Sequence, residues 1–188
     1  METVAGLDER ALVGRARVGD AAAFARLFAA YHGPLTNYLY RLVQDRDLAD
    51  DLVQDTFLRA YCALGRTDAD LLFRPWLYRI ATNLARNHHR RQRILRWLPF
   101  GVVAARASTD APLAERLGEH ELVVGALRQI GPTSASALLL HYQHGLSLAE
   151  TAVALGLTRN GAKARLFRAR KAFITAYASL DGGRGGTP

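Results

Sequence analysis

The sequence lacks several features that would assign it to common classes of protein. It contains a single cysteine, Cys62, in 188 residues, so no disulfide can form within the chain. Such a chain is expected in a reducing, cytoplasmic environment. No run approaches the roughly 20 apolar residues of a membrane-spanning helix, and the first residues lack the basic and apolar segments of a secretory signal. These absences predict a cytoplasmic protein without membrane insertion.

The motifs of common catalytic and metal sites are missing as well. There is no phosphate-binding glycine loop, no GxSxG and no HExxH. His141 and His144 have a spacing that would let them share a metal ion, but no third ligand is close to them in the sequence. We therefore expect no cofactor, no metal and no catalysis by this chain.

Acidic residues are outnumbered by basic ones. The chain has 25 Lys and Arg against 17 Asp and Glu, a formal net charge of +8, with a pI near 10.2. A surplus of this size favours a polyanionic partner, either nucleic acid or an anionic membrane surface.

Proline and glycine are scarce between residues 20 and 98, where apolar residues recur at helical spacing and β-branched runs are absent. Gly33 and Pro34 are expected to interrupt the helical pattern of residues 24–43, with Pro34 in the first turn of a new helix. The sequence predicts an all-α protein of two small helical domains joined by a flexible linker. The expected parts are an N-terminal lead-in (1–19), a first domain (20–97), a linker (98–118), a second domain (119–180) and a disordered tail (181–188).

The second domain contains the pattern of a helix-turn-helix. Ser147 and Glu150 have the spacing of a capping box at the start of a helix. Gly156 suits the left-handed residue that ends it, and Thr158 can cap the following helix. Two helices joined by a short glycine turn are typical of DNA-binding domains.

The helix after the turn is basic and holds no acid up to Arg170. Its apolar residues share one stripe, which would face the domain core: Ala162, Leu166, Ala169 and Phe173. At the helix start, Arg159, Asn160, Lys163 and Arg165 are candidates for contacts with base edges in a major groove, and Arg168 and Arg170 are candidates for phosphate contacts. A solvated helix with surplus arginine is the alternative.

Residues 45–64 predict a helix with an acidic exposed face. Leu48, Leu52, Val53, Thr56, Ala60 and Leu64 form its buried stripe, whereas Asp51, Gln54, Asp55 and Leu58 lie together on another face. An exposed leucine among acids indicates a docking surface for a basic protein. A solvated acidic face with one stray leucine is equally compatible with the pattern.

Residues 73–97 predict a helix that begins aromatic and ends basic, with Arg86, Arg90, Arg91, Arg93 and Arg96. Aromatic rings beside a cationic surface suit single-stranded nucleic acid, whose bases stack and whose phosphates pair with arginine. Trp76 is also compatible with a core position, because its neighbours have helical spacing.

These segments together resemble extracytoplasmic-function sigma factors of the bacterial sigma-70 family. DLADDLVQDTFLRAY resembles region 2.2, FRPWLYRIATNLARNHHRR resembles regions 2.3 and 2.4, and GLSLAETAVALGLTRNGAKARLFRARKAF resembles region 4.2. The resemblance implies a subunit that binds core RNA polymerase through the β′ clamp helices and the β flap. It also implies recognition of the −10 and −35 promoter elements, with the loop at 65–72 helping to hold the −10 strand, and control by an anti-sigma factor.

Site residues follow from this resemblance. For polymerase binding we expect Asp50, Asp51, Gln54, Asp55 and Leu58. For the −10 element we expect Trp76, Asn83, Arg86, Arg90 and Arg91. For the −35 element we expect Thr158, Arg159, Asn160, Lys163, Arg165, Arg168 and Arg170.

Two other functions remain open at this level. One is a stand-alone helix-turn-helix regulator, whose first domain would serve for dimerisation. The other is a degenerate sigma-like protein that titrates an anti-sigma factor. Gly161 and Ala162, which stand where the family usually has Thr and Val, keep the second alternative open.

Overall fold

The computed structural model describes residues 8–97 and 117–182 of the chain, with side chains over 8–93 and 118–182. Every regular element in these parts is helical, and the described residues contain no strand. In chain order the elements are α1 (Glu9–Arg17), α2 (Ala21–Val43), α3 (Arg46–Leu64), α4 (Phe73–Trp97), α5 (Leu117–Gln129), α6 (Pro132–Leu138), the π-helical turn η1 (Leu139–Gln143), α7 (Leu148–Leu155) and α8 (Arg159–Gly182). The predicted all-α fold is confirmed.

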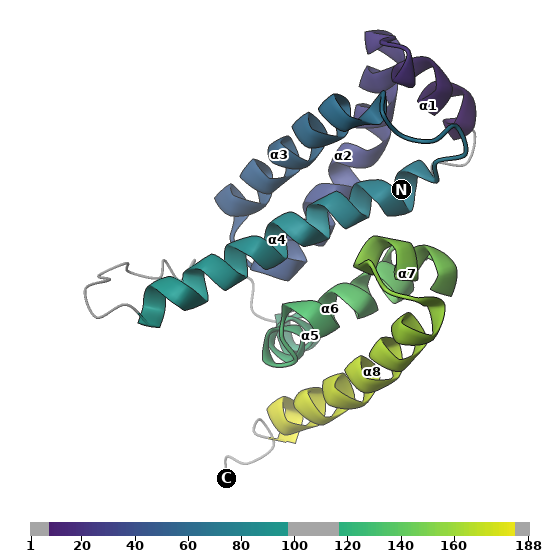
Figure 1. Ribbon diagram of the computed structural model, residues 1–188. Coiled ribbons are helices and arrows are strands. Elements are labelled where there is room, and N and C mark those ends of the chain that lie inside the picture. The colour runs from purple at the N-terminus through teal and green to yellow at the C-terminus, as the bar shows by residue number, and fades with distance from the viewer. Residues whose placement is uncertain (1–7, 98–116, 183–188) are drawn as a thin grey trace.

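The first module is built from α1 to α4; α2, α3 and α4 lie side by side in Figure 1, and α1 packs against α2 at one end of them. Asp8, Asp20 and Asp45 begin the first three helices, each accepting a backbone N–H from the first turn at 3.0 Å. Such caps satisfy donors that have no partner within the helix. The apolar faces of the helices meet in a core whose largest buried side chains include Tyr31, Tyr38, Tyr78, Phe73 and Leu77.

The predicted interruption at Gly33 and Pro34 is wrong, because α2 runs through both residues. Pro34 lacks an N–H and costs the helix one hydrogen bond. However, the buried residues before and after it form a single stripe at helical spacing: Leu27, Tyr31, Leu35 and Tyr38. Continuous burial along this stripe outweighs the local cost, and Pro34 itself faces outward.

The segment expected as a lead-in contains a helix that contributes to the core. In α1, Leu12, Val13 and Ala16 are buried, and Glu9 accepts a hydrogen bond from the hydroxyl of Tyr31 on α2. The first module therefore begins at α1 rather than at residue 20.

The second module consists of α5 to α8. Ser147 and Glu150 form the predicted capping box of α7, and Gly156 ends that helix with a φ of 65°. Thr158 accepts the N–H of Gly161 at 3.1 Å at the start of α8. The stripe of α8 packs inward as predicted, with Ala162, Leu166 and Ala169 buried and Phe173 half-buried.

The ends of the second module differ slightly from the prediction. Helix α5 begins at Leu117, inside the expected linker, and α8 continues to Gly182, so Asp181 and Gly182 are helical rather than part of a disordered tail. The rest of the predicted linker (98–116) and of the tail (183–188) lies outside the described residues.

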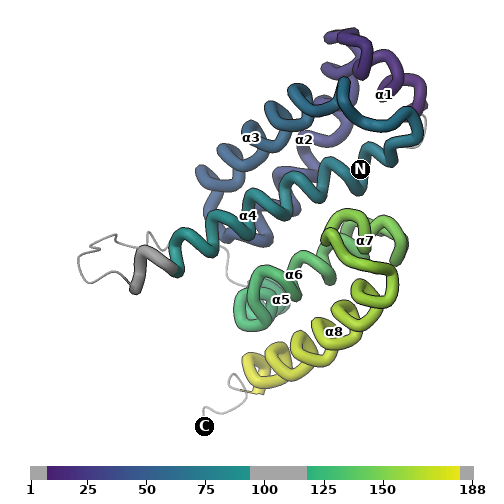
Figure 2. Tube along the Cα trace, in the orientation of Figure 1, coloured from purple at the N-terminus to yellow at the C-terminus, as the bar shows by residue number. Residues whose placement is uncertain are grey.

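The two modules pack against each other. Helix α7 and the turn before it lie along α4, as the tube in Figure 2 shows, and α6 approaches both α2 and α4. Side chains from residues far apart in the sequence meet at this junction. For example, the amide of Gln143 donates to Asn37 on α2 at 2.8 Å.

Candidate protein and nucleic-acid interfaces

Helix α3 presents an acidic surface to solvent. Its apolar side packs into the module core through Leu52, Val53, Thr56, Phe57 and Ala60. The opposite side exposes the five residues predicted for polymerase binding: Asp50, Asp51, Gln54, Asp55 and Leu58. Leu58 is 62% exposed, an arrangement that suits contact with a basic and partly apolar protein surface.

Asp47 belongs to this acidic face although the sequence analysis did not include it. It is exposed and lies one helical turn before Asp50 and Asp51 on α3. Extending the helical spacing by one turn toward the N-terminus would have found it. Carboxylates in this first turn are also favoured by the positive end of the helix dipole.

Helix α4 carries a basic stripe beside its buried face. Asn83, Arg86 and Arg90 are exposed, and their spacing of three and four residues places them on one side of the helix. Arg79 and Arg93 continue this side in the two directions and are exposed as well. We refer to Arg79, Asn83, Arg86, Arg90 and Arg93 as the α4 stripe.

Two predicted −10 residues lie apart from the α4 stripe. Arg91 is exposed, but as the direct neighbour of Arg90 it projects from another side of the helix. Trp76 is half-buried and packs against the core, with its ring 5.9 Å from that of Phe73. The loop before α4 contributes an exposed Leu72, which sequence reasoning did not single out.

Helix α8 exposes the basic residues predicted for the −35 element. Arg159, Asn160, Lys163, Arg168 and Arg170 are exposed, whereas Arg165 is half-buried. The Nε atom of Arg165 is shielded from solvent and has no hydrogen-bond partner among the described residues. Thr158 is exposed, and its hydroxyl oxygen caps the helix.

Phe167 is a further residue of this surface that sequence reasoning missed. Its side chain is 72% exposed, and it lies one turn after Lys163 on α8. The sequence pattern that could have indicated Phe167 is an aromatic residue outside the buried stripe of a helix that otherwise exposes cations. An exposed ring there can contact apolar groups of a ligand that the cations hold.

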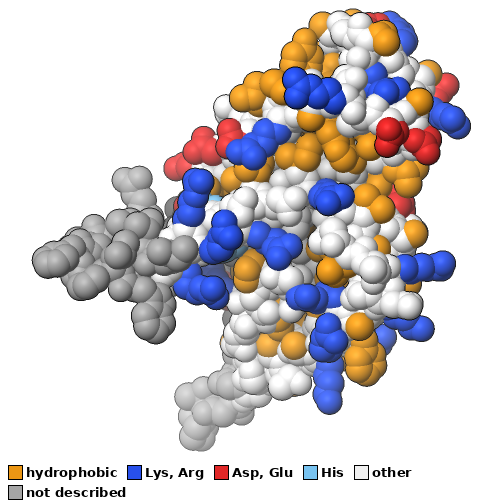
Figure 3. Space-filling model, in the orientation of Figure 1, with side chains coloured by type: hydrophobic (Ala, Val, Ile, Leu, Met, Phe, Trp, Pro, Cys, Tyr) orange, Lys and Arg blue, Asp and Glu red, His pale blue; other side chains and the backbone are white. Residues whose placement is uncertain are grey.

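Acidic and basic side chains gather on different parts of the molecule. Figure 3 shows many Lys and Arg side chains over α4 and the second module and some on the rest of the first module, while the acidic side chains lie on the first module, in one group at the edge formed by α3 and in another on the opposite side. Within the described part of the chain, no salt bridge links Asp51 or Asp55 to a base, or pairs Arg86 or Arg90 with an acid. These charges are therefore available to partners.

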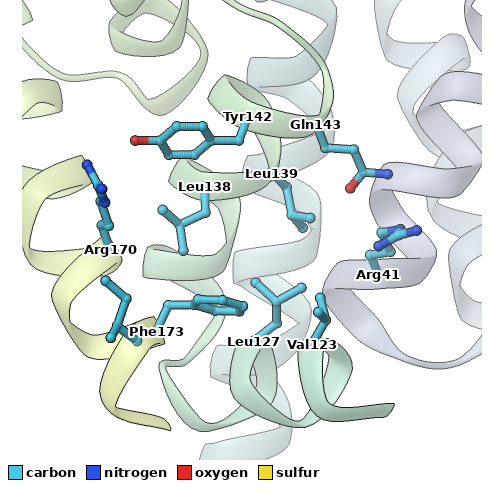
Figure 4. A pocket seen from close by; sticks show the side chains of 10 residues that line it. Arg41, Val123, Leu127, Leu138, Leu139, Tyr142, Gln143, Arg170 and Phe173 are labelled. Carbon is cyan, nitrogen blue, oxygen red and sulfur yellow. The ribbon is translucent and has the colours of Figure 1, made fainter. Parts of the chain in front are cut away.

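A mostly apolar hollow with a volume of about 570 Å³ lies in the second module, among α5, α6, η1 and α8, and is bordered by Arg41 of the first module. Figure 4 shows Leu138, Leu139 and Phe173 lining it, with Arg170 on one side and Arg41 of the first module on the other. Tyr142, at its edge, is also among the exposed large side chains. Such a surface suits an apolar segment of another protein.

A cluster of rings joins the modules at His144. Its Nδ1 lies 3.0 Å from the hydroxyl oxygen of Tyr78, and its ring is 5.6 Å from that of Tyr38. Burial, together with nearby Arg74 and Arg41, lowers the pKa of His144 to about 4. Burial also raises the pKa of Tyr38 to about 12, so at neutral pH the cluster is uncharged.

His141 and His144 both take part in other contacts. Nδ1 of His141 lies 2.8 Å from the carbonyl oxygen of Leu146, and His144 meets Tyr78. Over residues 8–93 and 118–182 there is no group of three or more His, Cys, Asp or Glu side chains placed to hold a metal ion. Within the same residues, no helix is long and apolar enough to cross a membrane.

Comparison with protein families identifies both modules. Residues 27–94 match the model "Sigma-70 region 2", and residues 120–173 match "Sigma-70, region 4". The first match covers the acidic face and the α4 stripe, and the second covers the helix-turn-helix. The fold and its surfaces thus define a two-module transcription factor of the sigma type.

The chain belongs to the sigma-70 family, and its function is that of a sigma factor. It is 33% identical to RNA polymerase sigma factor NccH of Alcaligenes xylosoxydans xylosoxydans, over 86% of this chain and 90% of the relative. It is 32% identical to RNA polymerase sigma factor CnrH of Cupriavidus metallidurans, over 92% of this chain and 95% of the relative.

A solved structure of CnrH in complex with the cytosolic domain of CnrY has the same architecture. It aligns with a TM-score of 0.70 at 29% identity, over 93% of this chain and 97% of that chain. The resemblance stated from the sequence is therefore confirmed at the level of the family and of the fold.

Proposed function

We propose that this chain directs core RNA polymerase to promoters as an extracytoplasmic-function sigma factor acting in the cytoplasm. The observation that carries the proposal is the separation of charge, with an acidic exposed face on α3 and basic exposed faces on α4 and α8. One surface suits a protein and the others suit nucleic acid. In this proposal the polymerase carries out the chemistry.

In this proposal the acidic face of α3 binds the β′ clamp helices. Asp51 and Asp55 supply charge, and Leu58 supplies an apolar anchor that is exposed in the free chain. Charged groups of this kind speed association and set the register of the complex, whereas the buried apolar anchor adds affinity. Asp47, Asp50 and Gln54 extend the contact.

The α4 stripe holds the −10 element. Arg86 and Arg90 bind phosphates of the separated strand, and Asn83 is placed between them and the aromatic start of the helix. Trp76 is partly covered by Phe73, so its exposed edge rather than its full face would meet a base. Residues 65–72 and Arg91 border this surface.

Helix α8 reads the −35 element in the major groove. Its first residues, Arg159, Asn160 and Lys163, reach base edges, while Arg168 and Arg170 bind phosphates. Phe167 lies on the exposed side of the same helix, where a ring can pack on the methyl group of thymine. The main role of Thr158 is to cap this helix.

The apolar hollow of the second module is the proposed site for a regulatory protein of the anti-sigma type. The solved relative CnrH is in complex with the cytosolic domain of CnrY. In this chain the hollow combines apolar side chains with Arg41 and Arg170 on opposite sides, which suits an apolar segment flanked by acids. The β flap of the polymerase would contact the second module as well.

The test is to mix the purified chain with core polymerase and a library of linear duplexes with random upstream sequence. The proposal predicts a stable complex and strand opening on a subset of the duplexes that share two separated elements. A stand-alone regulator would instead select duplexes without polymerase and open none. A degenerate protein that only titrates an anti-sigma factor would do neither.

A further inference from the structure

The loop between α3 and α4 lies against α1. Figure 1 shows this loop, residues 65–72, running beside α1 before α4 begins. In the proposed function the loop borders the surface that holds the −10 strand. Helix α1 precedes residues 27–94, which match the model of region 2, so one side of this contact lies outside the matched residues.

Arg17, at the end of α1, contacts the loop in two ways. Its Nη2 atom donates to the backbone carbonyl oxygen of Thr67. Its own carbonyl oxygen lies so close to Gly65 that a methyl group added there would be only 3.2 Å away. Gly65 has an ordinary helical φ of −63°, so the close approach of α1, rather than the backbone conformation, favours glycine at this position.

The side chain of Arg17 is held by its surroundings. It is half-buried, and its Nε atom is shielded from solvent and has no hydrogen-bond partner among the described residues. Helix α1 is fixed to α2 by the hydrogen bond from Tyr31 to Glu9 and by the pairing of Arg15 with Asp20 at 2.7 Å. Arg17 therefore projects toward the loop from a firmly anchored helix and is not solvated like a free surface arginine.

The hydrogen bonds that the loop makes within itself are local. The hydroxyl and the N–H of Thr67 both donate to the carbonyl oxygen of Leu64, at 2.7 Å and 3.1 Å, and the N–H of Leu71 donates to Asp68 at 3.3 Å. These bonds shape the loop but do not join it to another helix, whereas the bond from Arg17 does. Binding surfaces on loops are less precise than those on helices unless supporting contacts hold them.

We propose that Arg17 is a positioning residue for the −10 element, which it serves by holding residues 65–72 in place beside the separated strand. Asp68 and Asp70 are exposed on this loop, and a carboxylate can accept a hydrogen bond from the amino group of cytosine. A displaced loop would therefore change which bases fit. This inference rests on the proposed function for its consequence, but the hold of Arg17 on the loop is measurable without polymerase.

The first measurement is amide hydrogen exchange of the free chain, followed by nuclear magnetic resonance. Arg17→Ala should speed exchange of the Thr67 and Leu71 amides roughly two- to tenfold, the equivalent of one lost hydrogen bond. Arg17→Lys keeps a donor and should restore part of the protection. Arg10→Ala removes an exposed arginine from the same helix and is the matched control. Unchanged exchange of the two loop amides in Arg17→Ala, or equal acceleration throughout α2, would overturn the proposal.

A second variant disturbs the same contact without removing the guanidinium. Gly65→Ala places its methyl group against the carbonyl oxygen of Arg17 and should also speed exchange in the loop. Gly14→Ala on α1 is the control, because an added methyl group there meets nothing within 4 Å. Equal exchange rates in Gly65→Ala and Gly14→Ala would contradict the close approach of α1 to the loop.

The consequence for promoters is measured by run-off transcription with core polymerase and the full chain on a set of −10 variants. Arg17→Ala should reduce discrimination among the −10 sequences roughly two- to tenfold, with Arg17→Lys intermediate and the preference for −35 sequences unchanged. A merely structural role would lower transcription from all promoters alike, and that result would overturn the proposal. If the unmodified chain gives no transcripts, the proposed function fails, and hydrogen exchange alone decides whether Arg17 holds the loop.

Discussion

The hydroxyl of Tyr78 on α4 meets Nδ1 of His144 at 3.0 Å, although the two residues are 66 positions apart. This contact makes the packing of the two modules against each other dependent on pH. The pKa of His144 is lowered to about 4 by burial and by Arg74 and Arg41, while Tyr38 and Tyr78 flank its ring. Once the modules part, the imidazole regains an ordinary pKa near 6.5.

The state with the modules apart therefore binds one more proton than the packed state, and acid favours it by linkage. The contribution of His144 to the packing of the modules is fully present above about pH 6.5, and below it the ratio of packed to separated modules falls up to about tenfold for each pH unit, down to about pH 4. Energy transfer between labels at Cys62 and Thr175→Cys, one in each module, should change over this range while helicity stays constant. His144→Gln, which keeps a hydrogen-bonding group but does not titrate, should remove the dependence. An unchanged pH response in that variant would assign the effect to another group.

The capping box of α7 predicts a measurable loss of stability. Ser147 accepts the N–H of Glu150 at 3.2 Å, and the Glu150 carboxylate accepts the N–H of Ser147 at 2.8 Å. Ser147→Ala should lower the free energy of unfolding by about 1 kcal/mol, measured by urea denaturation. Ser179→Ala, near the end of α8, is the control and should change it by less. Equal losses in the free energy of unfolding for Ser147→Ala and Ser179→Ala would show that the capping box adds no stability of its own.

The acidic face predicts a change in binding without a change in fold. Asp51→Arg with Asp55→Arg should weaken affinity for core polymerase roughly tenfold or more, because charge reversal replaces attraction with repulsion. The far-ultraviolet circular dichroism should not change, since both residues are exposed. Glu119→Arg on α5 reverses an exposed acid of the other module and serves as the control. Unaltered affinity of the double variant would remove this face from the polymerase contact.

The α4 stripe predicts a defect in strand opening. Arg86→Ala, Arg90→Ala and Arg91→Ala together should impair promoter opening more than initial duplex binding, as permanganate reactivity would report. Because Arg91 projects from another side of α4, Arg91→Ala alone should have the smallest effect of the three. Normal melting by the triple variant would contradict the assignment of this stripe to the separated strand.

Helix α8 is predicted to carry two classes of cationic residue, those that contact base edges and those that contact phosphates. Substituting Arg159 or Lys163 should relax preference at one or two −35 positions, since a good bidentate base contact discriminates by about 1–3 kcal/mol. Arg168→Ala should weaken binding to all duplexes alike and reduce the salt slope by roughly one. A salt titration of the full chain with core polymerase against −35 variants separates the two. Indistinguishable, sequence-independent losses would make α8 an electrostatic anchor only.

Local signals predicted much of this architecture. The capping box at Ser147, the turn at Gly156 and the exposed acids of α3 follow from spacing within one or two helical turns, and the structure confirms them. Pro34 misled the prediction, because local propensity indicated a break where burial of Tyr31 and Leu35 keeps one helix. Burial depends on the other helices, which a local pattern does not contain.

Contacts between distant residues were out of reach of the sequence. Nothing near His144 indicates that its ring meets Tyr38 and Tyr78, because that contact arises only when the second module packs on the first. The core role of α1 was missed for a similar reason, since its three buried residues are too few to form a clear pattern. The assignment of site residues to polymerase and promoter contacts stays a prediction.

In the proposed function, this chain selects promoters for core polymerase through two separated DNA surfaces. The most direct measurement is run-off transcription from a random promoter library by core polymerase with and without the full chain, with the start sites and upstream sequences of the transcripts read out. Transcripts should appear only when the chain is present and should share two upstream elements, of which the distal one changes in Lys163→Ala. Transcripts that do not depend on the chain, or that share no upstream element, would contradict it.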